Sequence, residues 1–459
     1  MTLSIDRSSL TEKTPKRRPY LALLDSIRSD VESGRLQPGE KLPTQRELAK
    51  RLGLAVGTVT KAYSEAAKQG LISTEVGRGT FVLGLAHGAT GRAPFDLTFN
   101  RVAYEDAHAA EIAADLGRLL RRVTRPGAFD YNPSADSREH REHGAQWLRG
   151  MGVDAGADRV LICNSVQHGL SLILQSLARP GSLVLTEQLG YPGIGLLESV
   201  LGFQLRGLAM DSHGLTVETL KQACEREPAR ILVCAPTLHN PTNGILPMQR
   251  RVELAEFARS RDLTIIEYDV NGIPPDDPLP SFTVLAPERS YLLTGTWKAT
   301  PMGAGLGYIV APAESAERLT AVVQATTWTP SPLLRQIVTN WIADGTAARA
   351  IDWHKREVTK RLAIVRPMLE GFDYHWHPAS YHIWLTLPAP WRREIFVEAL
   401  RGVGIAVSPA DVFIVGRSIA PHAVRLALGG ISDLPSLSKA AATIVDTLRK
   451  GPQPRIVTA

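Results

Sequence analysis

Apolar residues recur at intervals of three and four along the first 70 residues of the chain. This spacing predicts helices over residues 20–31, 45–52 and 59–69. Thr44 and Glu47 form the Ser/Thr-x-x-Glu pattern of a capping box at the start of the second helix, and Gly53 ends that helix. The three helices therefore have local start and stop signals as well as an apolar face.

The period changes from helical to alternating in LISTEVGRGTFVL, residues 71–83. Apolar residues alternate on either side of Gly77-Arg78-Gly79, which predicts a two-stranded hairpin with a glycine-containing tip. Three helices followed by a hairpin are typical of a winged helix-turn-helix. A small three-helix protein-interaction module is the alternative interpretation of the same pattern.

The charge of the chain is concentrated in this first segment. Residues 1–83 contain 14 Lys and Arg against 9 Asp and Glu, so they carry +5 of the net charge of +6. The third helix places Thr58, Thr60 and Lys61 opposite its apolar side. A basic module on a nearly neutral body indicates an anionic partner, and we expect double-stranded DNA rather than a membrane.

Beyond residue 95 the pattern predicts an α/β fold with a mostly parallel sheet. Short β-branched runs alternate with helical stretches up to about residue 350, and a smaller α+β lobe follows. We expect a tail at 1–17, a DNA-binding domain at 18–83, a linker at 84–95, a large domain at 96–350, a small lobe at 351–450 and a tail at 451–459. The Gly- and Ala-rich composition of the linker favours independent motion of the two parts.

Composition excludes several other classes of protein. No apolar run approaches the roughly 18 residues of a membrane span, and the polar first 20 residues lack the core of a signal peptide, so we expect a cytoplasmic protein. Cys163, Cys224 and Cys234 lack metal-like spacing, so we expect buried thiols and no metal site.

The run GEKLPTQRELAKRLGLAVGTVTKAYSEAAKQGLISTEVGRGTFV closely resembles the DNA-binding domain of the GntR family of bacterial transcription regulators. The resemblance implies that Arg46, Thr58, Thr60 and Gly77 contact DNA. Charge and position add Lys61 and Arg78 to this set. For each of these exposed side chains, simple solvation is the alternative role.

The body resembles a fold-type I aminotransferase over almost its whole length. The phrases EQLGYPGI, PTLHNPTNGILP, IIEYDVNG, TGTWKATPMGAGLGYIV and SPADVFIVGRSIAPHAVRLALGG carry this resemblance. A GntR-type domain ahead of such a body resembles the MocR subfamily of regulators. That subfamily implies a homodimer that senses a small molecule.

The resemblance also implies a site for pyridoxal phosphate. It places Lys298 at the Schiff-base position, Asn240 at the ring-oxygen position and Tyr191 against the ring face, with Arg425 as the clasp for an α-carboxylate. Other roles stay open: a buried or salt-bridged structural lysine for Lys298, local capping or ion pairing for Asn240 and Arg425, and core packing for Tyr191.

Five residues depart from the pattern of that family. Tyr268 stands for the acid near the ring nitrogen and Asn271 for a tyrosine, while Gly295, Trp297 and Gly305 replace two serines and an arginine that hold the phosphate. Asp269 is next to Tyr268, but neighbouring strand residues point to opposite faces, so we expect that it does not replace the missing acid. These departures weaken the predicted cofactor site.

Two functions follow from these residues. The first is a DNA-binding transcription regulator whose aminotransferase-like domain dimerises and senses an amino acid, an amine or a pyridoxal phosphate adduct. The second is a pyridoxal phosphate-dependent aminotransferase that carries a DNA-binding domain. An interaction scaffold is a third interpretation, but it leaves the basic winged domain unexplained.

Overall fold

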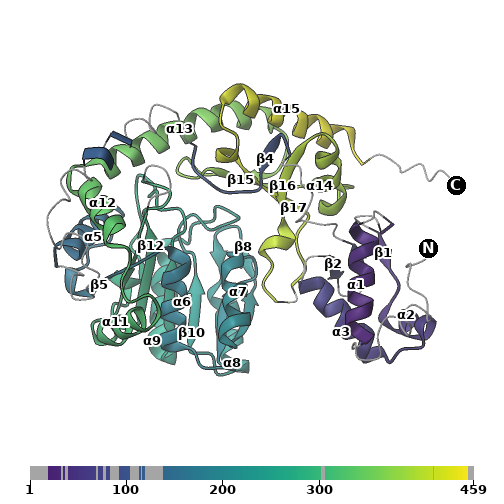
Figure 1. Ribbon diagram of the computed structural model, residues 1–459, viewed down its shortest axis with the longest axis horizontal. Helices are drawn as coiled ribbons and strands as arrows, with labels where there is room; N and C mark the ends of the chain where they lie inside the picture. The colour runs from purple at the N-terminus through teal and green to yellow at the C-terminus, as the bar shows by residue number, and fades with distance from the viewer. Residues whose placement is uncertain are drawn as a thin grey trace.

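The computed structural model describes residues 19–32, 35–36, 40–68, 71–75, 79–82, 93–103, 113–114, 116–118, 138–300, 305–416 and 418–452. They form a head, a large lobe and a small lobe (Figure 1). The predicted tail at 1–17 and most of the predicted linker lie outside these residues. None of the described helices is long and apolar enough to cross a bilayer.

The head consists of the three helices and the hairpin predicted from sequence. Its elements are α1 (Pro19–Glu32), β1 (Lys41–Leu42), α2 (Gln45–Leu52), α3 (Val56–Lys68), β2 (Ile72–Glu75) and β3 (Gly79–Val82). β3 pairs antiparallel with both β2 and β1. β1 was not predicted, because two residues are too short to show a strand period.

Local chemistry sets the boundaries of α2. The Thr44 hydroxyl accepts a hydrogen bond from the Glu47 amide at 3.2 Å, and the Glu47 carboxylate accepts one from the Thr44 amide at 2.9 Å. Gly53 ends the helix with φ of 66°, in the left-handed region that favours glycine. The predicted capping box is therefore confirmed.

The large lobe is built on a seven-stranded sheet. The strand order is β5-β13-β12-β11-β10-β6-β7, and only β13 runs antiparallel to its neighbours. The strands are β5 (Val160–Cys163), β6 (Leu183–Glu187), β7 (Gln204–Leu208), β10 (Ile231–Cys234), β11 (Thr264–Tyr268), β12 (Ser290–Gly295) and β13 (Gly307–Val310). The predicted mostly parallel sheet is confirmed.

Helices cover both faces of this sheet, which is why its strands are apolar on both sides. One face packs on α6 (Val166–Leu177), α7 (Pro192–Leu201) and α11 (Ala316–Thr327). The other face packs on α5 (Arg138–Gly150), α8 (Val217–Arg226), α9 (Met248–Arg261), α10 (Phe282–Leu285) and α12 (Pro332–Ala343). A two-stranded ribbon, β8 (Met210–Asp211) and β9 (Gly214–Leu215), completes the lobe. Cys163 and Cys234 are buried as expected, whereas Cys224 is half-buried.

The small lobe packs helices against a five-stranded sheet of order β14-β15-β17-β16-β4. The strands are β4 (Phe95–Leu97), β14 (Tyr374–His375), β15 (His382–Thr386), β16 (Ile405–Pro409) and β17 (Ala423–Ala427). The helices are α13 (Thr346–Met368), α14 (Arg393–Gly402) and α15 (Leu434–Lys450), with the 3₁₀ turn η5 (Ala410–Phe413) after β16. β4 pairs parallel with β16. The structure therefore places residues 95–97 in the small-lobe sheet, where the predicted boundaries placed residue 95 in the linker and residues 96 and 97 in the large domain.

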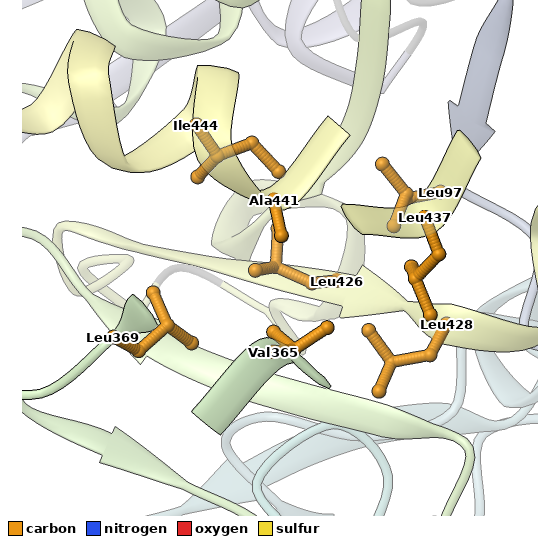
Figure 2. A pocket seen from close by; sticks show the side chains of 8 residues that line it. All are labelled: Leu97, Val365, Leu369, Leu426, Leu428, Leu437, Ala441 and Ile444. Carbon is orange, nitrogen blue, oxygen red and sulfur yellow. The ribbon is translucent and has the colours of Figure 1, made fainter. Parts of the chain in front are cut away.

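A small void lies inside the small lobe, between its sheet and α13 and α15. Its volume is about 10 Å³, and the eight residues that line it have only carbon in their side chains (Figure 2). A space of this size without polar partners does not hold even one water stably. The void belongs to the hydrophobic core and is not a ligand site.

Candidate functional site

Residues far apart in the sequence meet where the strands of the large lobe end beside the small lobe. Asn240 follows β10, Lys298 follows β12, and Arg425 lies on β17. Arg425 Nη1 donates to Asn240 Oδ1 at 2.8 Å, and Lys298 is close enough to Arg425 for the two charges to interact. The structure thus brings together three of the four residues that the aminotransferase resemblance placed at one site.

Lys298 presents an amine that loses its proton easily. Burial lowers its pKa to about 8, and the neighbouring Arg425 charge adds to this effect while Asp269 opposes it. Its nearest polar contact is Asn271 Oδ1 at 3.5 Å. None of the ion pairs found among the described residues includes Lys298, so the salt-bridged alternative has no support there.

Arg425 is a buried guanidinium that contacts neutral acceptors. Besides Asn240, it donates from Nη2 to the Thr98 carbonyl at 2.6 Å, and it lies 4.8 Å from the centre of the Phe413 ring. Its Nε is buried and has no hydrogen-bond partner among the described residues. Burial lowers its pKa to about 10. A buried cation with spare donor capacity and, among the described residues, no carboxylate partner is suited to an incoming anion.

The position predicted for the ring-nitrogen acid holds a phenol. The Tyr268 hydroxyl accepts a hydrogen bond from the Tyr191 amide at 3.2 Å, and burial raises its pKa well above the usual range. The Tyr191 and Tyr268 rings are 6.2 Å apart and tilted by 43°. Tyr191 is half-buried at the start of α7. Its side chain therefore packs against Tyr268 and is still partly exposed to solvent.

Asp269 lies just beyond the last residue of β11. Its carboxylate accepts hydrogen bonds from the Asn271 amide at 2.8 Å and from Thr294 Oγ1 at 3.1 Å. Its charge also acts on Lys298. Alternation along the strand was expected to turn the Asp269 side chain away from the site. β11 ends at Tyr268 and the chain turns after it, so the alternation does not determine which groups Asp269 contacts.

The positions predicted to hold a phosphate are filled by the protein itself. A Cβ atom on Gly305 would lie 2.7 Å from Trp297 Cα, and one on Gly295 would lie 2.9 Å from the Leu306 carbonyl oxygen. Both distances are far below van der Waals contact, so neither backbone position accepts a side chain without a shift. The Trp297 indole donates to the Asn164 carbonyl at 3.2 Å, directly ahead of α6.

These contacts fit one half of pyridoxal phosphate better than the other. Lys298, Asn240 and Tyr191 suit an aldehyde, a ring oxygen and a ring face. The phenol of Tyr268 does not supply the charge that a ring nitrogen needs, and the contacts of Trp297 and Gly305 replace the donors that a phosphate needs.

Three contributors to the site were not predicted. The Thr98 main-chain carbonyl accepts a hydrogen bond from Arg425, and a main-chain acceptor has no sequence motif. The face of the Phe413 ring packs against the Arg425 guanidinium. His382 is buried close to both Arg425 and Lys298, and burial lowers its pKa well below the usual range. Its Nε2 has no hydrogen-bond partner among the described residues. The histidine is visible in the sequence, but only the pairing of β15 with β17 brings it to the site.

The head presents a separate polar surface on α2 and α3. Arg46, Thr60 and Lys61 are exposed and Thr58 is half-buried. Thr60 Oγ1 donates to Gln45 Oε1 at 2.7 Å, which ties the two helices together, and Lys61 Nζ lies 4.4 Å from the centre of the Tyr20 ring. Gly77 and Arg78, the other predicted DNA contacts, lie outside the described residues.

Two protein families match this chain in succession. Bacterial regulatory proteins of the gntR family match residues 19–82, and the family of aminotransferases of class I and II matches residues 95–434. Residues 83–94 lie between the two matches. The second match covers well over half of the chain.

Curated relatives share both parts. An uncharacterized HTH-type transcriptional regulator of Bacillus subtilis (strain 168), YdeF, is 26% identical over 89% of this chain and 90% of its own length. The probable rhizopine catabolism regulatory protein MocR of Rhizobium meliloti is 24% identical over 84% of this chain and 85% of its own length. Among solved structures, the kynurenine aminotransferase of Pyrococcus horikoshii matches with a TM-score of 0.71 and 19% identity, over 80% of this chain and 93% of that one. At that identity the last match shows the fold.

Proposed function

This chain is a GntR-type transcription regulator whose body belongs to the family of aminotransferases of class I and II, and we propose that a small molecule bound in the body controls how the head binds DNA. The head supplies DNA binding, as in other GntR-type regulators. The body supplies a buried site at the junction of its two lobes. Binding there is regulatory only if the ligand distinguishes two arrangements of the heads.

The state of Arg425 carries this proposal. Its guanidinium is buried, its hydrogen bonds go to neutral oxygens, and its Nε has no partner among the described residues. Burying a cation without an anionic partner is unfavourable, and a carboxylate ligand would relieve that cost. The effector is therefore proposed to carry a carboxylate, as an amino acid or its adduct with pyridoxal phosphate does.

Pyridoxal phosphate, when bound, supplies an aldehyde and an electron-withdrawing ring. Lys298 would hold the aldehyde, Asn240 would donate to the ring oxygen and Tyr191 would cover the ring. Tyr268 stays neutral because burial raises its pKa, so it does not stabilise a protonated ring nitrogen. For this reason we propose sensing in preference to transamination.

The proposed DNA surface comprises the exposed face of the head. Arg46, Thr58, Thr60 and Lys61 are proposed to contact DNA, together with Gly77 and Arg78 at the hairpin tip. The chain is proposed to act as a cytoplasmic homodimer, so that two heads read repeated half-sites. Sedimentation velocity of the full chain tests the dimer, which would show about twice the mass of one chain.

The central experiment measures DNA affinity with and without ligand. Fluorescence anisotropy with a labelled fragment from upstream of the chain's own gene is expected to change when amino acids are added to the wild type. The same ligands should have no effect on the Arg425→Lys variant, because one ammonium group cannot make the paired hydrogen bonds that a guanidinium makes to a carboxylate. A ligand that occupies the body by calorimetry and leaves DNA affinity unchanged would contradict the proposal.

A further inference from the structure

We infer that the body site takes a small oxo acid, a carbonyl compound with a carboxylate and no phosphate, and holds it covalently on Lys298. This inference rests on the proposed function for the site and for its carboxylate ligand, and it puts an oxo acid in the place of the amino acid or adduct named there. It rests on a contrast between the two ends of the site. At one end, the closed end, the polar groups contact the protein itself, and at the other, the open end, the Arg425 guanidinium has only neutral hydrogen-bond acceptors among the described residues.

The closed end lies at the start of α6. The Asn164 carbonyl is taken by the Trp297 indole at 3.2 Å, and the Asn164 amide donates to His168 Nδ1 at 3.2 Å. The Ser165 hydroxyl accepts from the His168 amide at 3.1 Å and so caps its own helix. The carbonyl and amide of Asn164 and one acceptor position of the Ser165 hydroxyl are thus used within the protein.

None of the described residues named at this end is a cation that could balance a phosphate dianion. His168 is half-buried, and burial lowers its pKa, which keeps the imidazole neutral. Gly305 stands where the family resemblance has an arginine, and the backbone of Trp297 occupies the space that any side chain there would need.

The open end combines a nucleophile with an anion receptor. Lys298 and Arg425 are near enough for their charges to interact, and both also act on His382. The Arg425 Nε and the His382 Nε2 are buried and lack hydrogen-bond partners among the described residues. A carboxylate would satisfy the guanidinium while its carbonyl carbon faces the amine.

The covalent step is a condensation without any change of oxidation state. The neutral Lys298 amine forms a bond between Nζ and the carbonyl carbon, both amine protons end on the carbonyl oxygen, and that oxygen leaves as water. The lowered pKa of Lys298, about 8, keeps a useful fraction of the amine neutral near pH 7. Water reverses the step, so the ligand can leave again.

Trapping with borohydride tests this step on the full-length chain. We would add pyruvate or 2-oxoglutarate, reduce with borohydride, and measure the intact mass and the labelled peptide. The expected result is a mass gain equal to the oxo acid minus water plus two hydrogens, located on Lys298. The gain should disappear in Lys298→Met and fall at least tenfold at limiting ligand in Arg425→Lys.

A comparison of pyridoxal with pyridoxal phosphate tests the closed end. A working phosphate site would favour the phosphorylated form by roughly ten- to a hundredfold for each charge-assisted hydrogen bond. We expect no such preference here, and capture of pyridoxal at least as efficient as capture of its phosphate. Strong preference for the phosphate, or failure of every oxo acid to label Lys298, would overturn the inference.

A variant designed to gain a phosphate preference provides a test that a misfolded protein cannot pass. In the variant Trp297→Ser, the indole that takes the Asn164 carbonyl is removed and a hydroxyl stands where the family resemblance has a serine, so preference for the phosphorylated form should appear. Trp297→Phe is the matched control, because it removes the indole N–H but keeps a bulky ring, and it should retain the wild-type pattern. Circular dichroism and thermal unfolding would verify that each variant is folded.

The outcomes separate this inference from the proposed regulatory function. If pyridoxal phosphate is captured with strong phosphate preference and also changes DNA affinity, the regulatory proposal stands and the oxo acid inference is wrong. If an oxo acid labels Lys298 but DNA affinity does not respond to it, the ligand class stands and the regulatory proposal is contradicted.

Discussion

The head and the body assemble their functional surfaces in opposite ways. In the head, Thr44 and Arg46 lie within one turn of the same helix, and the polar face is exposed to solvent. In the body, Asn240, Lys298 and Arg425 come from segments nearly 200 residues apart; Asn240 and Arg425 are buried, and Lys298 is half-buried. One surface depends on local signals, and the other depends on the whole fold.

This difference determines what substitutions should do. A buried charge in the body has partners that lose their hydrogen bonds when it is removed, so stability and function fall together. An exposed residue of the head has water as its alternative partner, so DNA binding can change while the fold persists. The predictions below test this contrast.

The largest effect is expected at Arg251, which is fully buried on α9. It donates to the carbonyls of Pro236 at 2.8 Å and Leu246 at 3.0 Å, the two ends of the loop that carries Asn240. Arg251→Met should remove these hydrogen bonds, leaving the Pro236 carbonyl with only its bond from the Leu246 amide, and lower the free energy of unfolding by about 3–5 kcal/mol. Urea unfolding followed by tryptophan fluorescence measures this change.

Its neighbour on the same helix provides the control. Arg250 is partly exposed and pairs with Asp211 at 2.7 Å. Arg250→Met should cost no more than about 1 kcal/mol, because such pairs are screened by solvent. Equal losses for the two variants would show that burial of Arg251 does not have the structural role assigned to it.

The next effect concerns the pH dependence of Lys298 reactivity. With a pKa of about 8, the amine is protonated and unreactive well below pH 8 and neutral above it. About a tenth of it is neutral at pH 7, against roughly one part in a few thousand for an ordinary lysine of pKa about 10.4. The rate of borohydride-trapped labelling should therefore rise through pH 6–8 and level off above pH 8. A rate that keeps rising to pH 10 would indicate an ordinary lysine.

A smaller effect is expected at Arg46 in the head. Arg46→Ala should weaken DNA binding roughly tenfold and reduce the salt dependence of binding by about one charge. The free energy of unfolding should stay within about 0.5 kcal/mol of the wild type, because the side chain is exposed. Arg138→Ala, at an exposed arginine of the body, is the control and should leave DNA affinity unchanged.

The same contrast explains how much could be predicted from sequence. The capping box at Thr44, the helices of the head and the parallel strands of the body follow from periodicity and turn chemistry, and the structure confirms them. Lys298, Asn240 and Arg425 were identified through family resemblance, and the fold brings them together. The Thr98 carbonyl was missed because a main-chain acceptor has no side-chain signal, and His382 because its approach depends on strand pairing.

The smallest effect tests whether local chemistry alone determines the start of α2. Thr44→Ala removes the hydroxyl that accepts from the Glu47 amide and should cost about 1 kcal/mol, seen as faster amide hydrogen exchange in residues 45–52. Thr359→Ala on α13, where the hydroxyl only donates to the preceding turn, should change stability by less than about 0.5 kcal/mol. Hydrogen bonds from Thr44 lower the pKa of Glu47, so the capping contribution is present above the ordinary pKa of a glutamate and is lost as the pH falls through the lowered value. The difference between wild type and Thr44→Ala should therefore shrink in acid. If it persists unchanged at acid pH, the hydrogen bond from the Thr44 hydroxyl to the ionised Glu47 carboxylate contributes nothing to the cap, and the hydroxyl acts only as the acceptor for the Glu47 amide.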